Sequence, residues 1–467
     1  MSSREDAALT CDATMQNVND YIDANFDRFV DELLPLCRIA SLSSANTGLD
    51  ECAAQLAAMT RALGMRTEVI PLAGDGSPPL VFAVLDTPGA KRTILIYGHL
   101  DVQPAEPLGE WQSPPFEPTL RNGRLYGRGT SDNKGQLLAH LKAIEAMQHA
   151  GDGVPANIRI IIDPQEEIGS PLLSRFAEAN KAMFAADYCY IADAAAAAGD
   201  RPVLFFGNRG SCYVEVAVRT ANRDVHSGGF GGPMPNAAWR LVDFLQSLRH
   251  ADGSVAIEGF YDDVVPPTPA DHAAIAALPH NPAAWRAWLG VEGEAGPADV
   301  PYYEKNLLRP TLTICSLLAG NTERKVKTVI PATASAKIDI RLVSNQSPDD
   351  ILAKIRAHAE RHGFHDVGIE SFDFLYHPSK TPIDHPMGAV IANAVRENFG
   401  EEPLLYPVSG GSNPGHMLRN KLGLPTVMVP YATHDESSHG PNENLSLDFL
   451  RRGMKTSAAV FAGLAKL

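Results

Sequence analysis

The sequence predicts an α/β protein built from two domains, and three observations lead to this expectation. The chain has 467 residues, more than one hydrophobic core usually serves. Residues 1–210 alternate short apolar runs with helical patterns, as in a sheet layered by helices. Residues 211–386 contain strands of alternating polarity, as in a separate α+β unit, and the earlier style resumes over 387–467. We therefore expect 1–210 and 387–467 to form one domain around an inserted second domain, 211–386.

Three apolar runs of the first part are predicted to be buried strands. They are Thr93 to Tyr97 (TILIY), Ile158 to Ile162 (IRIII) and Tyr188 to Ile191 (YCYI). Between the first two, Lys134 to Met147 repeats apolar residues at three- and four-residue spacing, which predicts a helix. Another helix is expected after Pro171, because proline is favoured at the first helical position.

The inserted part has its own strand and helix patterns. Tyr213 to Val218 (YVEVAV) and Ala336 to Leu342 (AKIDIRL) alternate like half-buried strands. A helical stretch, Ala237 to Leu248, lies between them. The tract Val264 to Pro301 is rich in Pro, Ala and Gly, so we expect little regular sheet there.

The C-terminal part returns to the style of the first. Met387 to Asn398 is predicted to be a helix, and Thr426 to Val429 a short apolar strand. These elements should complete the first domain.

Composition and charge narrow the range of partners. Forty Lys plus Arg stand against 55 Asp plus Glu, a formal charge of −15, which repels phosphate backbones and anionic lipid surfaces. Nucleic acid and membrane partners are therefore disfavoured. The opening MSSREDAALTCD lacks the apolar core of a signal peptide, and no later stretch approaches the roughly 20 apolar residues of a membrane span. We expect a cytoplasmic protein.

Acids and histidines gather just after the apolar runs or in Gly-rich connections. They are His99 and Asp101 in GHLDV, Asp132 in GRGTSDNKG, Glu166 and Glu167 in DPQEEIG, Asp193 in YIAD and His439 in SSHGPNENL. In open α/β sheets this rim is where ligands bind. Imidazole nitrogen and carboxylate oxygen suit zinc or a similar cation. One shared carboxylate, with one histidine and one acid per ion, would hold two ions at roughly 3.5–4 Å.

A two-metal hydrolase also needs a base that is not consumed as a ligand. The adjacent Glu166 and Glu167 can supply it, because neighbouring side chains point differently and one can bind metal while the other faces the water. Asp101, two residues after His99, can accept the proton on the other ring nitrogen and fix the imidazole.

Each of these residues also has a structural alternative. Asp132 can be the N-cap of the helix that begins near Lys134, and the paired glutamates can complement a helix dipole. Asp193 can be a solvated loop acid, and His439 can belong to a surface turn. The placement of the whole set after successive strands favours the metal site.

The motifs GHLDVQP, GRGTSDNKG, PQEEIGS, NRG, VHSGGFGG and SSHGPNE, in this order, resemble those of the M20 family of metallopeptidases. The resemblance runs from about Tyr21 to the C-terminus and is greatest to the cytosolic dipeptidases related to carnosinase. It implies a catalytic domain with a mixed sheet of the zinc-peptidase type and an inserted α+β lid that carries dimer contacts. It also implies a homodimer that hydrolyses small peptides with two divalent ions per subunit, zinc or alternatively manganese or cobalt.

The resemblance assigns roles to the residues collected above. His99 and Asp193 would hold one ion, Glu167 and His439 the other, Asp132 would bridge them, Glu166 would be the general base and Asp101 would clamp His99. It further implies that the peptide bond from Asp132 to Asn133 is cis.

The resemblance also marks residues outside the metal site. His226 in VHSGGFGG and Thr328 in KTVIP would reach the partner subunit's site, where the histidine stabilises the oxyanion; a flexible Gly-rich loop is the alternative for the former. Arg341 in IDIRLV, with Ser412 in SGGSNP, would grip the substrate's free carboxylate, although Arg341 can also be a plain exposed strand residue. His385 in IDHP is a candidate for the same pocket.

The family leaves the substrate open, since relatives also cleave N-acyl amino acids and carbamoyl compounds. Aspartate rather than glutamate at position 193 resembles the dipeptidase and aminopeptidase members, so we expect dipeptides. A non-catalytic metal-binding protein of the same fold would lack a ligand or the base, and here all of them are present.

Overall fold

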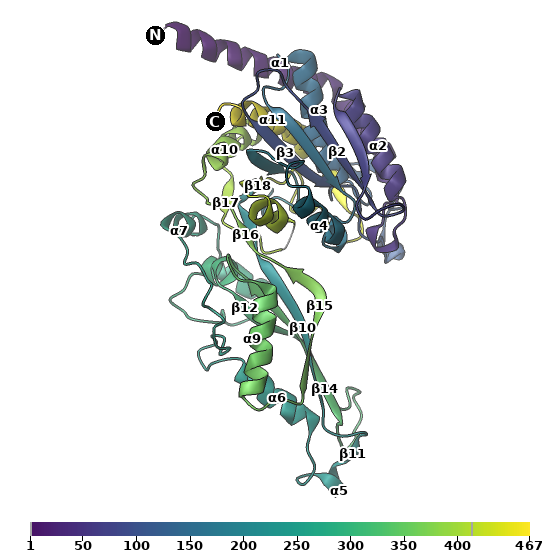
Figure 1. The fold of residues 1–467 in the computed structure, drawn as a ribbon, viewed down its shortest axis with the longest axis vertical. Helices are drawn as coiled ribbons and strands as arrows, with labels where there is room; N and C mark the ends of the chain where they lie inside the picture. Colours follow the sequence, from purple (N-terminus) through teal and green to yellow (C-terminus); the bar gives the residue numbers. More distant parts are fainter. Residues whose placement is uncertain (1, 412–413) are drawn as a thin grey trace. The chain divides into compact units, whose positions relative to one another are not determined.

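The computed structural model describes residues 2–411 and 414–467. The chain forms two compact units (Figure 1). Unit 1 is built from Met1–Gly207, Thr381–Tyr406 and Met417–Leu467, and unit 2 from Asn208–Lys380 and Pro407–His416. The predicted fold class is confirmed, because unit 1 holds a mixed sheet layered by helices and unit 2 is an α+β unit.

Unit 1 is organised around a mixed sheet with eight strands in the described part of the chain. In spatial order these are β1 (Arg66–Pro71), β2 (Pro79–Leu85), β6 (Asn157–Asp163), β3 (Thr93–His99), β7 (Tyr188–Ile191), β18 (Thr426–Met428), β8 (Val203–Phe205) and β17 (Leu404–Tyr406). The central strands β6, β3, β7 and β18 run parallel to one another. At one edge β2 pairs antiparallel with both β6 and β1, and on the other side β18 pairs antiparallel with β8. The four strands predicted for this domain correspond to β3, β6, β7 and β18.

Helices cover both faces of this sheet. They are α1 (Ser2–Arg38), α2 (Leu49–Ala62), α3 (Lys134–Ala150), α4 (Pro171–Ala179), α10 (Pro386–Phe399) and α11 (Leu447–Leu464). Successive side chains of a strand point to opposite faces, so Ile94 and Ile96 of β3 join the core with α1, α3 and α11, while Leu95 and Tyr97 join the core with Leu173 of α4. The helices predicted at Lys134, after Pro171 and at Met387 are confirmed as α3, α4 and α10.

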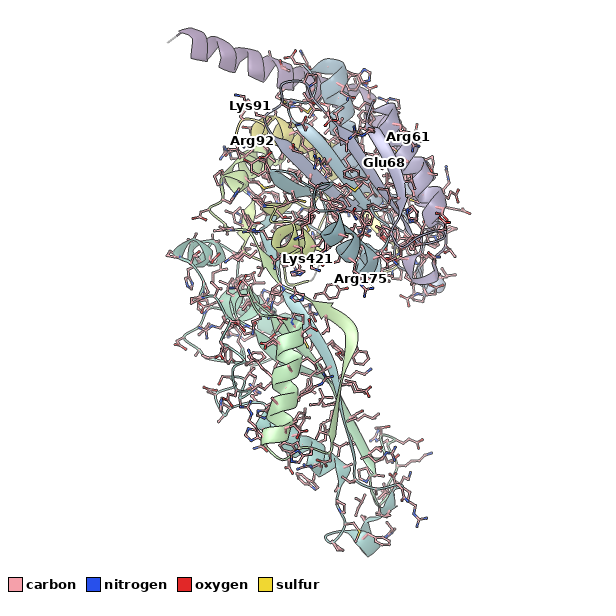
Figure 2. All side chains as sticks on the ribbon, viewed as in Figure 1. Arg61, Glu68, Lys91, Arg92, Arg175 and Lys421 are labelled. Atoms are coloured by element: carbon pink, nitrogen blue, oxygen red, sulfur yellow. The ribbon has the colours of Figure 1, made fainter. Side chains whose placement is uncertain are left out.

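Polar contacts tie the amino ends of β3 and β7 to the end of the chain. The N–H of Thr93 donates to Asp187 Oδ2 at 2.7 Å. Arg92, labelled in Figure 2, donates to Asp187 Oδ1 at 3.3 Å and to the main-chain oxygen of Leu467 at 2.5 Å. Leu467 is therefore held at the edge of the sheet where β3 and β7 begin.

Unit 2 contains an antiparallel sheet in the order β12 (Thr311–Ala319), β14 (Thr333–Leu342), β10 (Gly210–Arg219) and β15 (Val367–Tyr376). Helices α6 (Ala237–Ser247) and α9 (Pro348–Arg361) contribute to one core with the sheet, in which Val214 and Ile338 pack with Leu241 and Ile355. The strands predicted at Tyr213–Val218 and Ala336–Leu342 lie within β10 and β14, and the predicted helix is α6.

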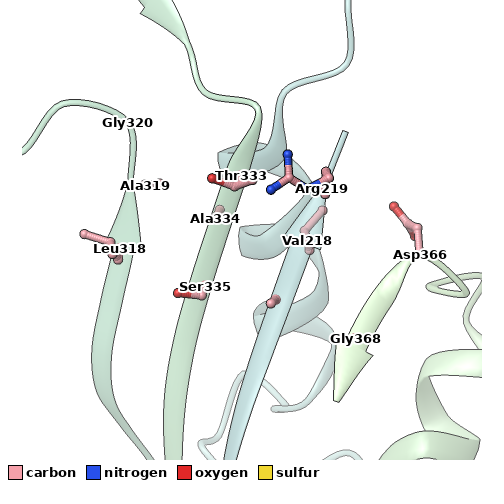
Figure 3. A pocket seen from close by; sticks show the side chains of 11 residues that line it. Val218, Arg219, Leu318, Ala319, Gly320, Thr333, Ala334, Ser335, Asp366 and Gly368 are labelled. Atoms are coloured by element: carbon pink, nitrogen blue, oxygen red, sulfur yellow. The ribbon is translucent and has the colours of Figure 1, made fainter. Parts of the chain in front are cut away.

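The edge strand β12 leaves apolar side chains in solvent. Ile314, Leu317 and Leu318 are 48%, 57% and 57% exposed. At one end of this sheet, β12, β14 and β10 border a pocket of about 510 Å³, shown in Figure 3 with Arg219 and Asp366 at its rim. No candidate site residue lines this pocket.

The tract Val264 to Pro301 forms two short helices, α7 (Pro269–Ala276) and α8 (Pro282–Leu289), and no strand, as expected. The shorter elements are η1 (Ser43–Ala45), η2 (Leu108–Glu110), β4 (Thr119–Arg121), β5 (Arg124–Tyr126), η3 (Glu166–Ile168), β9 (Gly207–Asn208), β11 (Val225–His226), α5 (Ser227–Phe230), η4 (Glu304–Leu308), β13 (Val329–Ile330), β16 (Ser379–Lys380), η5 (Met417–Lys421) and β19 (Asn444–Ser446). None of the described helices combines the length and apolarity needed to cross a membrane.

Candidate metal centre

Three parallel strands of unit 1 end at one edge of the sheet and deliver the candidate ligands there. His99 is the last residue of β3, paired with Asp163 at the end of β6. Glu167 follows β6 within η3, and Asp193 comes two residues after β7. Because the carboxyl ends of neighbouring parallel strands coincide, side chains from distant parts of the sequence meet at this edge.

Asp132 enters the same place from the loop that precedes α3. The peptide bond between Asp132 and Asn133 is cis, as the family resemblance implied. The Asn133 side chain donates to the carbonyl of Ala192 at 2.7 Å and accepts from the N–H of His99 at 3.4 Å. The turn that carries Asp132 is thereby tied to the ends of β3 and β7.

The carboxylate of Asp132 stands between two histidines. Its Oδ1 lies 3.1 Å from His99 Nε2, and its Oδ2 lies 3.1 Å from His439 Nε2. On the first side, Asp193 Oδ2 is 3.9 Å from His99 Nε2. On the second side, Glu167 Oε2 is 3.0 Å from His439 Nε2. All five predicted ligands therefore converge, in two sets that share Asp132.

The cluster contains more carboxylates than positive groups, and this excess of negative charge shifts the pKa values of its residues. Burial lowers the pKa of His99, but hydrogen bonds to Asp101 and Asp132 outweigh it and raise that pKa well above its usual value. Hydrogen bonds to Asp132 and Glu167 raise the pKa of His439 to about 10. Burial raises the pKa of Asp193 to about 6. In this arrangement protons on the imidazoles balance the carboxylates, and cations bound to the same atoms would take their place.

Asp101 holds two parts of the cluster at once. Its Oδ1 lies 3.3 Å from Nδ1 of His99, the nitrogen that faces away from Asp132. The same carboxylate accepts the N–H of Glu166 at 3.1 Å and the N–H of Glu167 at 3.0 Å. Asp101 therefore orients the imidazole and also anchors the turn that carries both glutamates, a second role that the sequence did not indicate.

Gln136 is a supporting residue that sequence reasoning missed. Its side-chain nitrogen donates to the carbonyls of Ser131 and Ala194, and its oxygen accepts the N–H of Tyr431. Ser131 and Ala194 adjoin Asp132 and Asp193 in the sequence, so Gln136 links the two segments that carry these candidate ligands. Gln136 directly follows the motif GRGTSDNKG. The motif gave no signal for its contacts, because two of its three main-chain partners, Ala194 and Tyr431, are distant in sequence.

Two predicted cross-subunit residues meet within unit 2. His226 and Thr328 lie on or beside the paired strands β11 and β13, and both are exposed. His226 Nδ1 accepts the N–H of Gly228 at 3.1 Å, which leaves the proton of a neutral ring on Nε2, 3.2 Å from the hydroxyl oxygen of Thr328.

The remaining predicted residues differ in their surroundings. Arg341 on β14 is half-buried and donates from Nε to Asp339 Oδ2 at 2.9 Å. Ser412 lies outside the described residues. His385 caps α10 through Nδ1, which accepts the N–H of Met387, and its ring stands edge-on to Tyr188 at the start of β7. The structure does not bring His385 to the candidate ligands, which gather at the opposite end of β7.

A mixed sheet whose parallel strands deliver imidazole and carboxylate groups to one edge is the arrangement of a metal-dependent hydrolase. The sequence matches the model described as Peptidase family M20/M25/M40 over residues 95–462. The chain therefore belongs to this peptidase family.

Individual relatives agree with that membership. Beta-Ala-His dipeptidase of Homo sapiens is 30% identical over 474 residues, covering 97% of this chain and 94% of that protein. A Cys-Gly metallodipeptidase of Schizosaccharomyces pombe is 30% identical over 387 residues, covering 81% of each. Among solved structures, the M20 family metallo-carboxypeptidase Sso-CP2 of Sulfolobus solfataricus matches with a TM-score of 0.83 at 29% identity, covering 94% of this chain and 99% of that one.

Proposed function

We propose that this protein is a metallodipeptidase, which hydrolyses the amide bond of dipeptides or short peptides with two divalent metal ions per subunit. One observation carries the proposal. Each oxygen of the Asp132 carboxylate lies 3.1 Å from Nε2 of a different histidine, His99 or His439. A carboxylate placed in this way can bridge two cations, each held by a histidine of its own.

The residues present fit such a pair of ions in donor type and in charge. His99, Asp132 and Asp193 would hold one ion, and Asp132, Glu167 and His439 the other. Imidazole nitrogen and carboxylate oxygen are the usual ligands of zinc, and manganese and cobalt accept the same donors. When bound, two such ions polarise a peptide carbonyl and lower the pKa of water at the site.

Glu166 would act as the general base that takes the proton of the attacking water and passes it to the leaving amine. Its neighbour Glu167 directs a carboxylate oxygen to His439, 3.0 Å away, so the two glutamates have separate tasks. Burial raises the pKa of Glu166 well above its ordinary value, and nearby carboxylates add to the effect. A raised pKa suits a group that must gain and release a proton near neutral pH.

Arg341 and Ser412 would bind the free carboxylate of the substrate. A guanidinium is suited to this task because its planar fork matches a carboxylate with two parallel hydrogen bonds. The 2.9 Å contact with Asp339 fixes the orientation of the Arg341 fork. His385, the other candidate, is not assigned this task, because it caps α10 beside the start of β7, at the opposite end of that strand from the candidate ligands.

The active assembly would be a homodimer in which His226 and Thr328 act on the partner subunit's site. His226 would stabilise the developing oxyanion, a task worth roughly 3–4 kcal/mol at comparable sites. Two features support a partner-facing unit 2. Both side chains are exposed. Among the described residues, no strand pairs with the outer edge of β12, and its exposed Ile314 and Leu317 lie on a surface that favours pairing with another chain.

Two other functions compete with this proposal. Hydrolysis of N-acyl or carbamoyl amino acids would use the same metal centre and the same carboxylate-binding Arg341. A non-catalytic metal-binding protein would need no base, and Glu166 argues against it. The dipeptidase names of the relatives from Homo sapiens and Schizosaccharomyces pombe favour dipeptides.

The experiment is a substrate panel with metal-free protein reconstituted with zinc, manganese or cobalt. Each dipeptide is paired with an N-acetyl and an N-carbamoyl derivative of its C-terminal amino acid. Metal-dependent cleavage of the dipeptides supports the proposal. Turnover of the acylated set alone would refute the dipeptide preference, and stoichiometric metal binding without turnover of any amide would favour the non-catalytic alternative.

A further inference from the structure

A buried carboxylate that is not among the candidate ligands lies directly behind Asp132. Glu443 is fully buried, four residues after His439 in the same loop. A charged group is rarely buried unless hydrogen bonds or ion pairs compensate for lost hydration. The contacts of Glu443 therefore indicate what the charge does in this place.

Within the described part of the chain, the hydrogen-bond donors to the Glu443 carboxylate come from one short segment, Arg128–Asp132. Its Oε1 accepts the N–H of Ser131 at 3.0 Å, the hydroxyl of Ser131 at 3.1 Å and the N–H of Asp132 at 3.1 Å. Its Oε2 accepts the N–H of Gly129 at 3.0 Å and Arg128 Nη1 at 2.7 Å. Both oxygens are thus occupied by donors, so Glu443 supports the turn and is not itself a ligand.

Arg128 extends the same contact to two further segments. Its side chain is 1% exposed, and its Nη2 donates to the carbonyls of Pro104 at 3.2 Å and Gly440 at 3.3 Å. Pro104 follows the strand end that carries His99, and Gly440 directly follows His439. One ion pair therefore connects the three chain segments that bring His99, Asp132 and His439 together.

We propose that Glu443, paired with Arg128, is a positioning residue that fixes the main chain of Asp132 so that both of its carboxylate oxygens face the histidines. This inference rests on the proposed two-metal function. Hydrogen bonds from N–H groups to a carboxylate are about twice as strong as neutral ones, and a site of this kind must be held within about 0.5 Å of its productive geometry. An amide at position 443 would turn an N–H₂ donor toward donors that need acceptors.

An ordinary structural ion pair is the competing explanation, and metal affinity separates the two. In Glu443→Gln we expect affinity for zinc, measured in competition with a chromophoric chelator, to fall 10- to 100-fold, as it does when groups that orient ligands are changed. The matched control is Glu145→Gln. Glu145 is also buried and is paired with Lys142 on α3, but it does not contact the ligand-bearing loops. This control should lower the melting temperature of the metal-free protein while zinc affinity stays unchanged.

Equal zinc affinity in Glu443→Gln and the wild-type protein would overturn the proposal. If Glu443→Gln does not fold, Arg128→Lys and Arg128→Met replace it: Lys keeps a charge beside Glu443 and should retain more zinc affinity than Met, and equal affinity in both would overturn the proposal. The readout does not depend on hydrolysis. A wild-type protein that cleaves no amide but binds zinc more tightly than Glu443→Gln would sink the dipeptidase function and leave the positioning role standing.

Discussion

His439 Nε2 lies 3.1 Å from Asp132 Oδ2, although the two residues are 307 positions apart along the chain. The other oxygen of Asp132 is 3.1 Å from His99. The single aspartate therefore belongs to both halves of the candidate centre, and removal of either histidine should affect only one half. This asymmetry can be measured.

Asp132→Ala should abolish binding of both metal ions, because it removes the shared ligand. Asp193→Ala and His439→Ala should each weaken the binding of one metal ion and leave the binding of the other unchanged. Metal content per subunit after dialysis, measured by plasma mass spectrometry, checks this. Asp200→Ala is the control, since the half-buried Asp200 belongs with His434 and Asp435 to a separate group of possible metal donors outside the candidate centre. Retention of two tightly bound ions by Asp132→Ala would exclude the bridging role.

Glu166→Gln should keep the wild-type metal content while kcat falls by roughly 10²- to 10⁴-fold, the usual contribution of a general acid–base group. Glu167→Gln should behave differently and lose metal, because Glu167 contacts His439. Metal analysis and steady-state kinetics on the same preparations compare the two. Turnover at the wild-type rate in Glu166→Gln would remove this residue from the mechanism.

Mixing inactive subunits tests whether His226 acts across a dimer. His226→Ala subunits keep Glu166, and Glu166→Gln subunits keep His226, so a mixed dimer contains one complete site only if His226 reaches its partner. We expect activity to reappear when the two variants are unfolded and refolded together. Activity no higher than that of the separate variants would place His226 in its own subunit's site or outside the reaction.

His140 should make the metal-free protein sensitive to acid. Burial lowers the pKa of His140 to about 3, whereas an unfolded histidine has a pKa near 6.5. The neutral ring is favoured in the folded state, so its contribution is complete above pH 6.5 and is lost at about 1.4 kcal/mol per pH unit as the pH falls toward 3.

His140→Phe should therefore flatten the loss of stability between pH 6.5 and 4.5, measured by urea unfolding without metal. Ser457, which contacts Nδ1 of His140, keeps the hydroxyl of Tyr431 as a partner at 3.0 Å. Replacement of the exposed His250 by Phe is the control and should leave the slope unchanged. The same slope in wild type and His140→Phe would contradict the assignment.

The parts of the fold predicted from sequence are those marked by local runs or regular spacing of apolar residues. The apolar run of β3 and the helical spacing of apolar residues in α3 indicated the type of each element, so these elements and the α/β class could be predicted. The spatial order of the sheet could not. Strand β18 lies between β7 and β8 in space, and no local pattern encodes such a pairing.

The candidate ligands were predictable for a related reason. His99 ends β3 and Asp193 follows β7, and the ends of these neighbouring parallel strands coincide. The supporting residues were not predictable, because their function lies in bonds to main-chain groups far away in sequence. Glu443 belongs to the same motif as His439, SSHGPNE. Only the fold shows that its carboxylate contacts the segment from Arg128 to Asp132.

The central place of β18 has a consequence for synthesis of the protein. A ribosome makes β7 long before Thr426–Met428, so the growing chain has β7 but lacks the neighbour that pairs with it in the finished sheet. His439 emerges later still. Before these segments emerge, a nascent chain can neither complete the sheet nor bring both sets of candidate ligands together, and β7 presents an unpaired strand edge that chaperones would have to cover.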